Sequence, residues 1–358
     1  MCKITAVVHL SQSNRQRGAF LPPLLYLARQ VKKWLILLFL IQASLSLQAQ
    51  RAVFMQRADE TVAGFDFAND IFFKTDKYFT HGTRVFTYND FLKSTPLRWL
   101  NLKTTGAKTD YYQGIFLLSN LYTPRDLEDT GIIVGDRPYA SYMLIGLSGI
   151  SNNPTGRYRL TSEVAGGVMG NTALGKQIQS LGHLIPPNNP PKGWDKQLSN
   201  SFVINYYVRA DYLLAEVPRR VEGFVSAEAN VGTLQLNTSF GGFVRLGLFD
   251  PYLRSIGPVT RRNVNYKRIS GYQFYIRAGQ ELKLVGYDGT MEGGLIKQRK
   301  NQYVLGPQDV TRQVWNTHAA LGWSLRNLFV EMRGDFVTHQ FRKGTDHRWG
   351  TIRVAFAF

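Results

Sequence analysis

The stretch TIRVAFAF, residues 351–358, alternates strictly between two kinds of side chain. From Ile352 onward, every second residue is large and apolar and the others are Arg or Ala: Ile352, Val354, Phe356 and Phe358 against Arg353, Ala355 and Ala357. Successive side chains of a β-strand point to opposite faces, so this period of two residues predicts a strand with one apolar face. An all-β fold follows if the pattern recurs upstream.

The alternation does recur upstream, most clearly in residues 201–214, SFVINYYVRADYLL. One face there carries Phe202, Ile204, Tyr206, Val208, Ala210 and Tyr212, and the other carries Ser201, Val203, Asn205, Tyr207, Arg209 and Asp211. Residues 272–284 and 328–339 follow the same rule. A soluble barrel or sandwich hides such an apolar face inside, whereas a transmembrane barrel turns it to lipid and lines its lumen with polar residues.

Three features favour the transmembrane barrel. The polar faces carry many opposite charges, which suits an ion-paired lumen, and the abundant Tyr and Phe suit aromatic girdles. The expected strands run about 11–16 residues, longer than the roughly five or six typical of soluble proteins and enough to cross a bilayer when tilted. A last strand that ends on an aromatic residue, Phe358, also resembles the signal read by the outer-membrane barrel assembly machinery.

We therefore predict an all-β fold, a twelve-stranded antiparallel transmembrane β-barrel with a short helix in an extracellular loop. The strands are expected near residues 62–73, 77–88, 111–123, 137–150, 156–169, 199–214, 219–234, 236–249, 268–284, 309–325, 327–341 and 347–358. Because the number is even, both termini lie in the periplasm and each odd-to-even connection faces outside. The helical segment, 171–185, falls in the third outer connection.

The N-terminal part has the pattern of an export signal. Residues 34–47, WLILLFLIQASLSL, are apolar but shorter than the roughly 20 residues of a membrane-spanning helix. Lys32 and Lys33 precede the run and Ala49 follows it, as in a cleaved signal peptide; an uncleaved anchor is the alternative. We expect residues 1–30 to be a misannotated extension, residues 31–49 to be the signal peptide and residues 50–358 to be the outer-membrane barrel domain.

Charge and cysteine content narrow the function. The 358 residues carry a formal net charge of +18 with a mean hydropathy of −0.20. Residues 1–49 hold six Lys and Arg and no acid, so the remainder carries about +12. A basic exported protein fits an anionic lipid surface better than nucleic acid. Because Cys2 is the sole cysteine, the mature protein is expected to lack a thiol nucleophile and a cysteine-ligated metal.

Three polar groups fall together on the predicted outer rim: Asn69 and Asp70, Arg137 in GDRPYA, and Gln179 with His183. Gln179 and His183 are spaced i, i+4 and so share a helix face. An imidazole titrates near neutral pH and can remove a proton from water. Asp70 could ligate a hard cation such as Ca²⁺, which would polarise an ester carbonyl. Arg137 could bind a phosphate or a carbonyl oxygen.

Each group also has a plain structural interpretation. His183 could be an ordinary surface histidine, Asp70 could pack against basic neighbours in the lumen, and GDRPYA could be a turn that Asp136 caps. The basic stretch 297–300 either is solvated or meets lipid phosphates. No GxSxG elbow supports a serine hydrolase, and no HExxH or paired-histidine motif indicates zinc. Spacing alone leaves these alternatives open.

Four blocks, in order, resemble the lipid A 3-O-deacylase (LpxR) family of outer-membrane enzymes. They are FDFANDIFFKTDKYFTHG (65–82), GDRPYASYMLIGL (135–147), ALGKQIQSLGHLI (173–185) and PKGWDKQLSN (191–200). The resemblance runs from about residue 62 to the C-terminus and weakens after residue 215. It implies a site open to the outer leaflet and a Ca²⁺-dependent hydrolysis of the 3′-acyloxyacyl ester of lipid A in lipopolysaccharide.

The resemblance also implies roles for individual residues. His183 matches the general base for the attacking water, and Asp70 matches the residue that holds the cation. Asn69 and Gln179 match residues that position the substrate and the oxyanion. The family's Ser/Thr and Lys are not assigned, and Arg137 is taken as a stand-in cationic partner of the oxyanion. The turn at residues 89–110 is long for a periplasmic connection.

Three functions therefore compete. The first is hydrolysis of a lipid A ester, the second is a phospholipase on a similar barrel, and the third is a non-catalytic pore or adhesin. A phospholipase would cleave glycerophospholipid, which a lipid A hydrolase would spare. A non-catalytic barrel would be chemically indifferent to His183→Ala. The convergence of polar groups on one rim favours catalysis.

Overall fold

The computed structural model describes residues 61–106, 109–182, 191–257, 259–260 and 272–358. The chain divides into two units, Met1–Arg57 and Ala58–Phe358, and all described residues belong to the second. The predicted extension 1–30 and signal peptide 31–49 lie outside the described residues. Among the residues that are described, no helix combines the length and the apolar character needed to cross a membrane.

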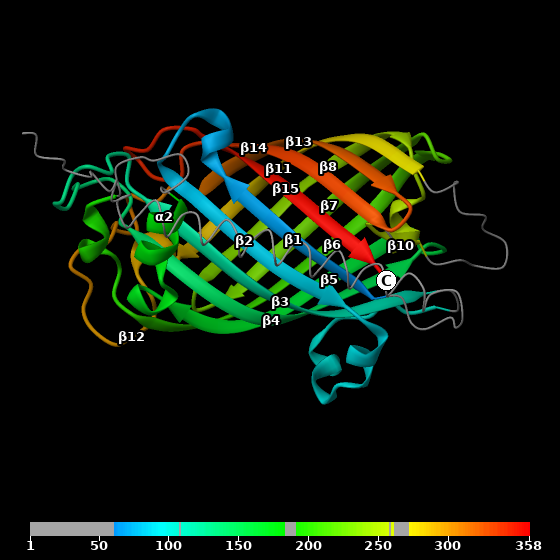
Figure 1. Ribbon diagram of the computed structural model, residues 1–358, viewed down its shortest axis with the longest axis horizontal. Helices are drawn as coiled ribbons and strands as arrows, with labels where there is room; N and C mark the ends of the chain where they lie inside the picture. The colour runs from blue at the N-terminus through cyan, green and yellow to red at the C-terminus, as the bar shows by residue number, and fades with distance from the viewer. Residues whose placement is uncertain (1–60, 107–108, 183–190, 258, 261–271) are drawn as a thin grey trace, which may run out of the picture. The chain divides into compact units, whose positions relative to one another are not determined.

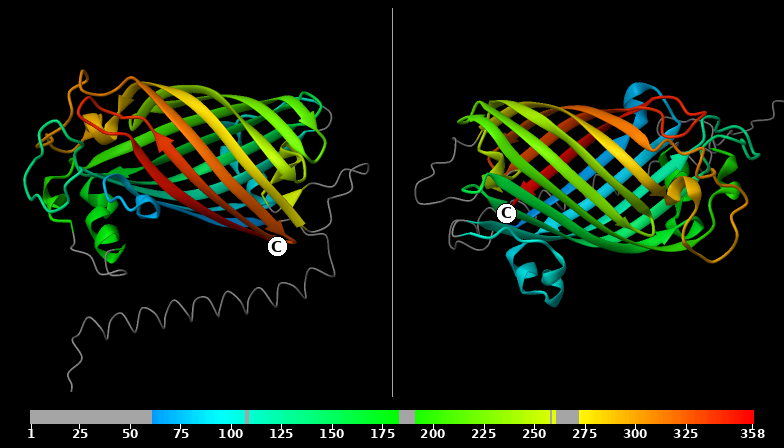
Figure 2. Two further views of the ribbon diagram at one scale, coloured as in Figure 1. Left: turned by 90° about the horizontal axis from the view of Figure 1, so that it is seen from above. Right: turned by 180° about the vertical axis from the view of Figure 1, so that it is seen from behind.

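Twelve antiparallel strands close into a barrel, as predicted (Figures 1 and 2). They are β1 (Val62–Asn69), β2 (Tyr78–Tyr88), β3 (Asp110–Thr123), β4 (Ala140–Asn153), β5 (Tyr158–Met169), β6 (Ser201–Val217), β7 (Val221–Gly232), β8 (Gln235–Leu248), β11 (Tyr272–Asp288), β13 (Gln313–Leu325), β14 (Leu328–Val337) and β15 (His347–Ala357). Each strand pairs with its neighbour in sequence, and β1 pairs with β15 from Val62↔Ala357 to Asn69↔Gly350. The first and last strands are thus joined, which leaves the wall without a free edge.

Short helices and short strands lie in the connections at the two ends of the barrel. Those between β1 and β6 are η1 (Asp70–Phe73), η2 (Asp90–Ser94), η3 (Pro96–Leu100), η4 (Asn171–Ala173), α2 (Gly175–Gly182) and η5 (Gly193–Lys196). The later ones are η6 (Tyr252–Arg254), the hairpin β9 (Ser255–Ile256) and β10 (Val259–Thr260), α3 (Gly289–Glu292) and β12 (Ile296–Lys297), which pairs with β6. Figure 1 shows α2 and β12 at the end opposite the C-terminus, here called the α2 end.

The alternation of side chains in β6 matches the prediction. Phe202 and Ile204 are more than half exposed on the outer face, whereas Val203 and Asp211 are buried on the inner face. Several predicted boundaries differ from the observed ones by three or four residues. The first strand was expected to reach residue 73 but ends at Asn69. The reason is local, because the Asn69 side chain accepts a hydrogen bond from the Ile71 amide and starts the 3-10 turn η1. The predicted helix 171–185 is described as η4 and α2 up to Gly182.

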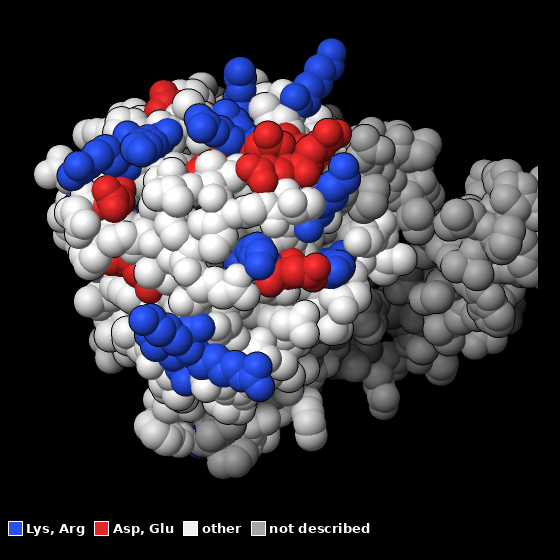
Figure 3. All heavy atoms as spheres, turned by 90° about the vertical axis from the view of Figure 1, so that its left-hand side faces the viewer, with Lys and Arg blue, Asp and Glu red and all other residues white. Residues whose placement is uncertain are grey.

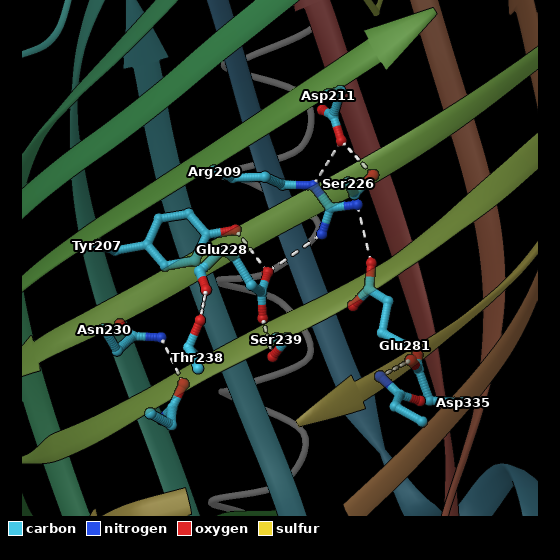
Figure 4. Close-up of polar contacts among 12 residues, drawn as sticks. Tyr207, Arg209, Asp211, Ser226, Glu228, Asn230, Thr238, Ser239, Glu281 and Asp335 are labelled. Carbon is cyan, nitrogen blue, oxygen red and sulfur yellow. Dashed lines mark hydrogen bonds and ion pairs between the residues drawn. The ribbon is translucent and has the colours of Figure 1, made fainter. Parts of the chain in front are cut away.

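Ion pairs cross the lumen (Figure 4). Arg209 contacts three carboxylates, Asp211 at 2.8 Å, Glu228 at 3.1 Å and Glu281 at 2.8 Å. Four further pairs join different strands: Arg84–Glu163, Arg245–Glu222, Arg277–Glu331 and Arg353–Asp66. A cavity of about 690 Å³ remains between them. The lumen is therefore largely filled by paired charges, which hold the strands in register.

Arg209→Met is expected to destabilise the barrel by about 3 kcal/mol or more, because it leaves three enclosed carboxylates without their shared cation. Lys176→Met, which breaks the exposed Lys176–Asp195 pair, is the matched control and should change stability by less than about 0.5 kcal/mol. Urea unfolding followed by the heat-modified gel mobility of the barrel measures both. Equal midpoints for the two variants would contradict the role given to Arg209.

Candidate active site at the α2 end

The first part of the site is the turn that ends β1. Asn69 caps η1 through the 2.7 Å bond from the Ile71 amide, and Lys74 closes the turn in the left-handed region with φ 59°. Asp70 is the first residue of η1 and is only 1 % exposed. The local turn therefore directs a carboxylate inward at the place where the strand leaves the barrel wall.

The Asp70 carboxyl group is enclosed by described residues that offer it no counter-charge. Its Oδ2 accepts hydrogen bonds from the Thr75 hydroxyl and the Lys77 backbone amide, both at 2.9 Å. Burial raises the pKa of Asp70 to about 8, and the neighbouring charge of Asp76 acts in the same direction. Within the described part of the chain, no Lys, Arg or His forms an ion pair with Asp70. Such a carboxylate is suited to a cation.

The second part of the site comes from α2. Gln179 is buried, and its Oε1 accepts a hydrogen bond of 2.7 Å from the indole Nε1 of Trp194. Its amide nitrogen points to Asp76 Oδ1 at 3.5 Å. Gly175 allows this close packing, since a Cβ there would lie 2.6 Å from both Ser141 and Trp194. The contacts Trp194–Gln179–Asp76 therefore lead from the helix to the neighbourhood of Asp70.

The structure thus brings Asn69, Asp70 and Gln179 to one end of the barrel, as the sequence predicted. His183, the predicted general base, lies outside the described residues, which stop at Gly182 on this side. Sequence reasoning missed Asp76 and Trp194. Both lie inside the quoted blocks, but nothing in their spacing indicated a contact with Gln179, which is 103 residues from Asp76.

Arg137 occupies a different place. Its guanidinium is buried, stacks on Tyr122 at 4.0 Å, and donates to Gln340 at 2.9 Å and to Thr290 at 2.5 Å. It lines a cavity of about 270 Å³ inside the barrel. Its backbone amide donates to the Asp136 carboxylate, as expected of a capped turn. Its described contacts therefore do not include Asp70 or Gln179, and its role as an oxyanion partner stays a prediction.

Thr80 is a further polar residue near this turn. It is the extra residue of a β-bulge, because Phe79 pairs with Tyr122 and His81 with Leu121. Its hydroxyl is buried and has no hydrogen-bond partner among the described residues. Bulges occur often beside active sites because they redirect a side chain out of the regular ladder. No periodicity in the sequence could have revealed this irregularity.

A cation at Asp70 would need mixed ligands. The described residues contain no group of three or more His, Cys, Asp or Glu placed to hold a metal ion. Ca²⁺ readily accepts backbone and amide oxygens together with one or two carboxylates. Asp70, with Asp76 as its charged neighbour, fits the carboxylate part of such a set. The donors present are all oxygens, which suits a hard cation and not zinc.

Gln179→Ala is expected to destabilise the protein by about 1–3 kcal/mol, because it leaves the buried indole nitrogen of Trp194 without its acceptor. Gln177→Ala is the matched control, since Gln177 is exposed on the same helix. Thermal unfolding in detergent measures both variants. A midpoint for Gln179→Ala that equals that of Gln177→Ala would mean that the bond contributes nothing.

Comparison with known proteins shows which protein family the chain belongs to. The family model described as "Outer membrane protein LpxR" matches residues 34–358. The chain belongs to the LpxR family. Among solved structures it is similar to LpxR from Salmonella typhimurium, with a TM-score of 0.67, 19% identity, and coverage of 83% of this chain and 100% of that one. As a member of this family with a closed barrel, it is an integral protein of the outer membrane.

Other solved barrels are more distant. The β domain of the Bordetella autotransporter BrkA aligns with a TM-score of 0.41 and 10% identity, over 85% of this chain and 100% of that one. The translocator domain of NalP from Neisseria meningitidis aligns with a TM-score of 0.39 and 12% identity, over 89% and 97%. No curated protein sequence matches this LpxR family member significantly.

Proposed function

We propose that this LpxR family member is a carboxylic ester hydrolase that removes the 3′-acyloxyacyl group of lipid A. The observation that carries the proposal is the enclosed Asp70 carboxyl group at the α2 end. The charge of Asp76 acts on it, and Asp76 Oδ1 lies 3.5 Å from the Gln179 amide nitrogen. A barrel in the outer membrane is surrounded by lipopolysaccharide in the outer leaflet. The α2 end would then face outside, as expected for odd-to-even connections.

The roles of the residues follow from their chemistry. A bound Ca²⁺ would supply positive charge that polarises the ester carbonyl. Asp70 would hold the ion, and Asn69 would keep the η1 turn that presents Asp70. His183 would take the proton from the attacking water at an imidazole nitrogen. Gln179, fixed by Trp194, would direct its amide toward substrate and oxyanion.

Thr80 is our candidate for the Ser/Thr that the family resemblance implies. Its buried hydroxyl without a described partner lies on the strand that follows the Asp70 turn, three residues after Lys77. A hydroxyl in that state can donate to a developing oxyanion or to a bound ester oxygen. The family's Lys stays unassigned.

Recognition of the substrate would be electrostatic. Figure 3 shows several groups of Lys and Arg over the face at the α2 end, with acidic groups between them. Lys192 precedes η5 and Lys196 ends it, and both are exposed next to α2. Lys297 of β12 is exposed as well, together with Arg299 and Lys300 just after it. Ammonium and guanidinium groups at the α2 end of the barrel can bind the phosphates of lipid A.

Mass spectrometry of lipid A tests the proposal. The protein is expressed in a Gram-negative host, and the lipid A is compared with and without Ca²⁺ and beside a host that lacks the gene. Loss of one acyloxyacyl group in the presence of Ca²⁺ supports the proposal. Release of fatty acid from glycerophospholipid instead would indicate a phospholipase. Unchanged lipids around a folded, heat-modifiable barrel would indicate a non-catalytic member, although the ion pairs that fill the lumen disfavour an open pore.

A further inference from the structure

The long connection between β2 and β3 projects from the side of the barrel and is hydrogen-bonded to its wall. In Figure 1 it lies beside β3 and β4 at the end that carries the C-terminus. The side chain of Asn101 donates to the Ser162 carbonyl at 2.8 Å, and the Leu102 amide donates to the Ser162 hydroxyl at 2.8 Å. The Thr104 amide donates to the Ser151 hydroxyl at 2.9 Å. These bonds anchor the connection on β4 and β5.

The surface that receives it is the outer wall. Thr161 and Glu163 line the internal cavity, so Ser162 between them points outward. By the same alternation, Ser151 points outward beside cavity-lining Ile150. Gly149 confirms the close approach, because a Cβ there would lie 2.6 Å from Asn101. The connection therefore lies against the face that the rest of the barrel turns to lipid.

Its own exposed side chains are aromatic and basic. Phe91 is 78 % exposed and Trp99 is 74 % exposed, although both are large apolar residues. The segment 89–106 contains three basic residues, Lys93, Arg98 and Lys103, against the single acid Asp90. Exposed Trp and Phe with Lys and Arg in a short amphipathic segment are typical of elements that lie in a membrane–water interface.

We infer that residues 89–106 form an interfacial foot, which inserts Phe91 and Trp99 among phospholipids of the leaflet at the C-terminal end. The foot is continuous with the lipid-facing wall, where Ile115 and Leu117 of β3 are exposed. Ser162 is four residues past the start of β5, or about 13 Å along the strand at about 3.3 Å per residue. With the tilt of the strands, this reaches the boundary between headgroups and acyl chains.

The basic residues fit the same position. Arg98 donates to the Lys93 carbonyl at 3.2 Å, and the Lys103 ammonium lies 4.5 Å from the centre of the Tyr111 ring. Both cations lie on exposed residues, where their charges can meet lipid phosphates. An anionic phospholipid surface therefore complements both the aromatic and the basic side chains. The inference is independent of the proposed hydrolysis, because it concerns the opposite end of the barrel.

Site-specific fluorescence tests the foot. The full chain with Cys2→Ser receives Trp99→Cys or Phe91→Cys, is labelled with an environment-sensitive dye, and is folded into vesicles of phosphatidylethanolamine and phosphatidylglycerol. Leu117→Cys on the lipid-facing wall is the positive control, and Glu128→Cys in an exposed α2-end loop is the negative control. Heat-modified gel mobility verifies that every variant is folded.

We expect the dye at positions 99 and 91 to show the blue shift and the quenching by doxyl-labelled lipid seen with Leu117→Cys. Emission like that of Glu128→Cys at both positions would overturn the inference, because the foot would then lie in water. A blue shift without quenching by lipid would also overturn it, in favour of a second copy of the chain covering the segment. The mass of the detergent-solubilised particle would identify that dimer.

Discussion

Asp70→Asn is expected to lower the rate of lipid A deacylation by about 10²–10³-fold, the scale of losing one electrostatic stabiliser of an oxyanion. The substitution keeps the size of the side chain and an oxygen acceptor for Thr75 and the Lys77 amide. It removes the ability of the side chain to carry the negative charge that would hold a cation. Lipid A mass spectra over a time course, with purified protein and added Ca²⁺, measure the rate.

A second measurement tests the binding of the cation independently of the rate of deacylation. If Asp70 holds Ca²⁺, saturating Ca²⁺ stabilises the wild-type protein, by about 2.7 kcal/mol at a hundred times the dissociation constant. Asp70→Asn should abolish this stabilisation. The matched control is Asp195→Asn, an exposed acid at the same end whose pair with Lys176 is solvated. Stabilisation by Ca²⁺ that survives Asp70→Asn would assign the cation to other residues.

His183→Ala is expected to lower deacylation by about 10²–10⁴-fold, the usual contribution of a general base. Unlike Asp70→Asn, it should leave the stabilisation by Ca²⁺ intact, because an imidazole is a poor ligand for this hard cation. The rate of deacylation should fall while the stability of the folded barrel changes little. Lipid A mass spectra and Ca²⁺-dependent unfolding, recorded on the same preparation, measure the two effects.

His339→Ala is the matched control for His183→Ala. His339 follows β14 in a connection at the α2 end and is about half exposed, with Asp346 at 3.7 Å from its ring. Its removal should leave deacylation unchanged. Equal activity of both variants and the wild type would remove His183 from the mechanism. Loss of Ca²⁺ stabilisation in His183→Ala would instead make it a part of the cation site.

The twelve strands and their two faces could be predicted from sequence because the signal is local. Alternation such as Val203 against Ile204 follows from strand geometry alone and requires no knowledge of partners. The even number of strands then indicated which connections lie at each end of the barrel. It predicted that Asn69, Asp70 and Gln179 lie at the same end. The boundary at residue 73 failed because the Asn69 cap outweighs the apolar run that follows it.

The contacts inside the site depended on tertiary structure. Gln179 meets Trp194 and Asp76 because the barrel wall brings the third outer connection beside the first one. Arg137 lies in the connection between β3 and β4 at the same end of the barrel. Its side chain nevertheless turns into the lumen and contacts Gln340, which is 203 residues away. A local alternation with a period of two residues does not predict the direction of either side chain.

The sequence by itself therefore determined the barrel, the facing of its strands and the end at which the candidate site lies, because each follows from local periodicity and closure of the sheet. Only the tertiary structure decided which polar groups meet there, that Asp70 is enclosed without a described cation partner, and that residues 89–106 turn onto the outer wall. The physical reason is that these contacts join distant strands, so burial and hydrogen bonding fix them only after the barrel has closed.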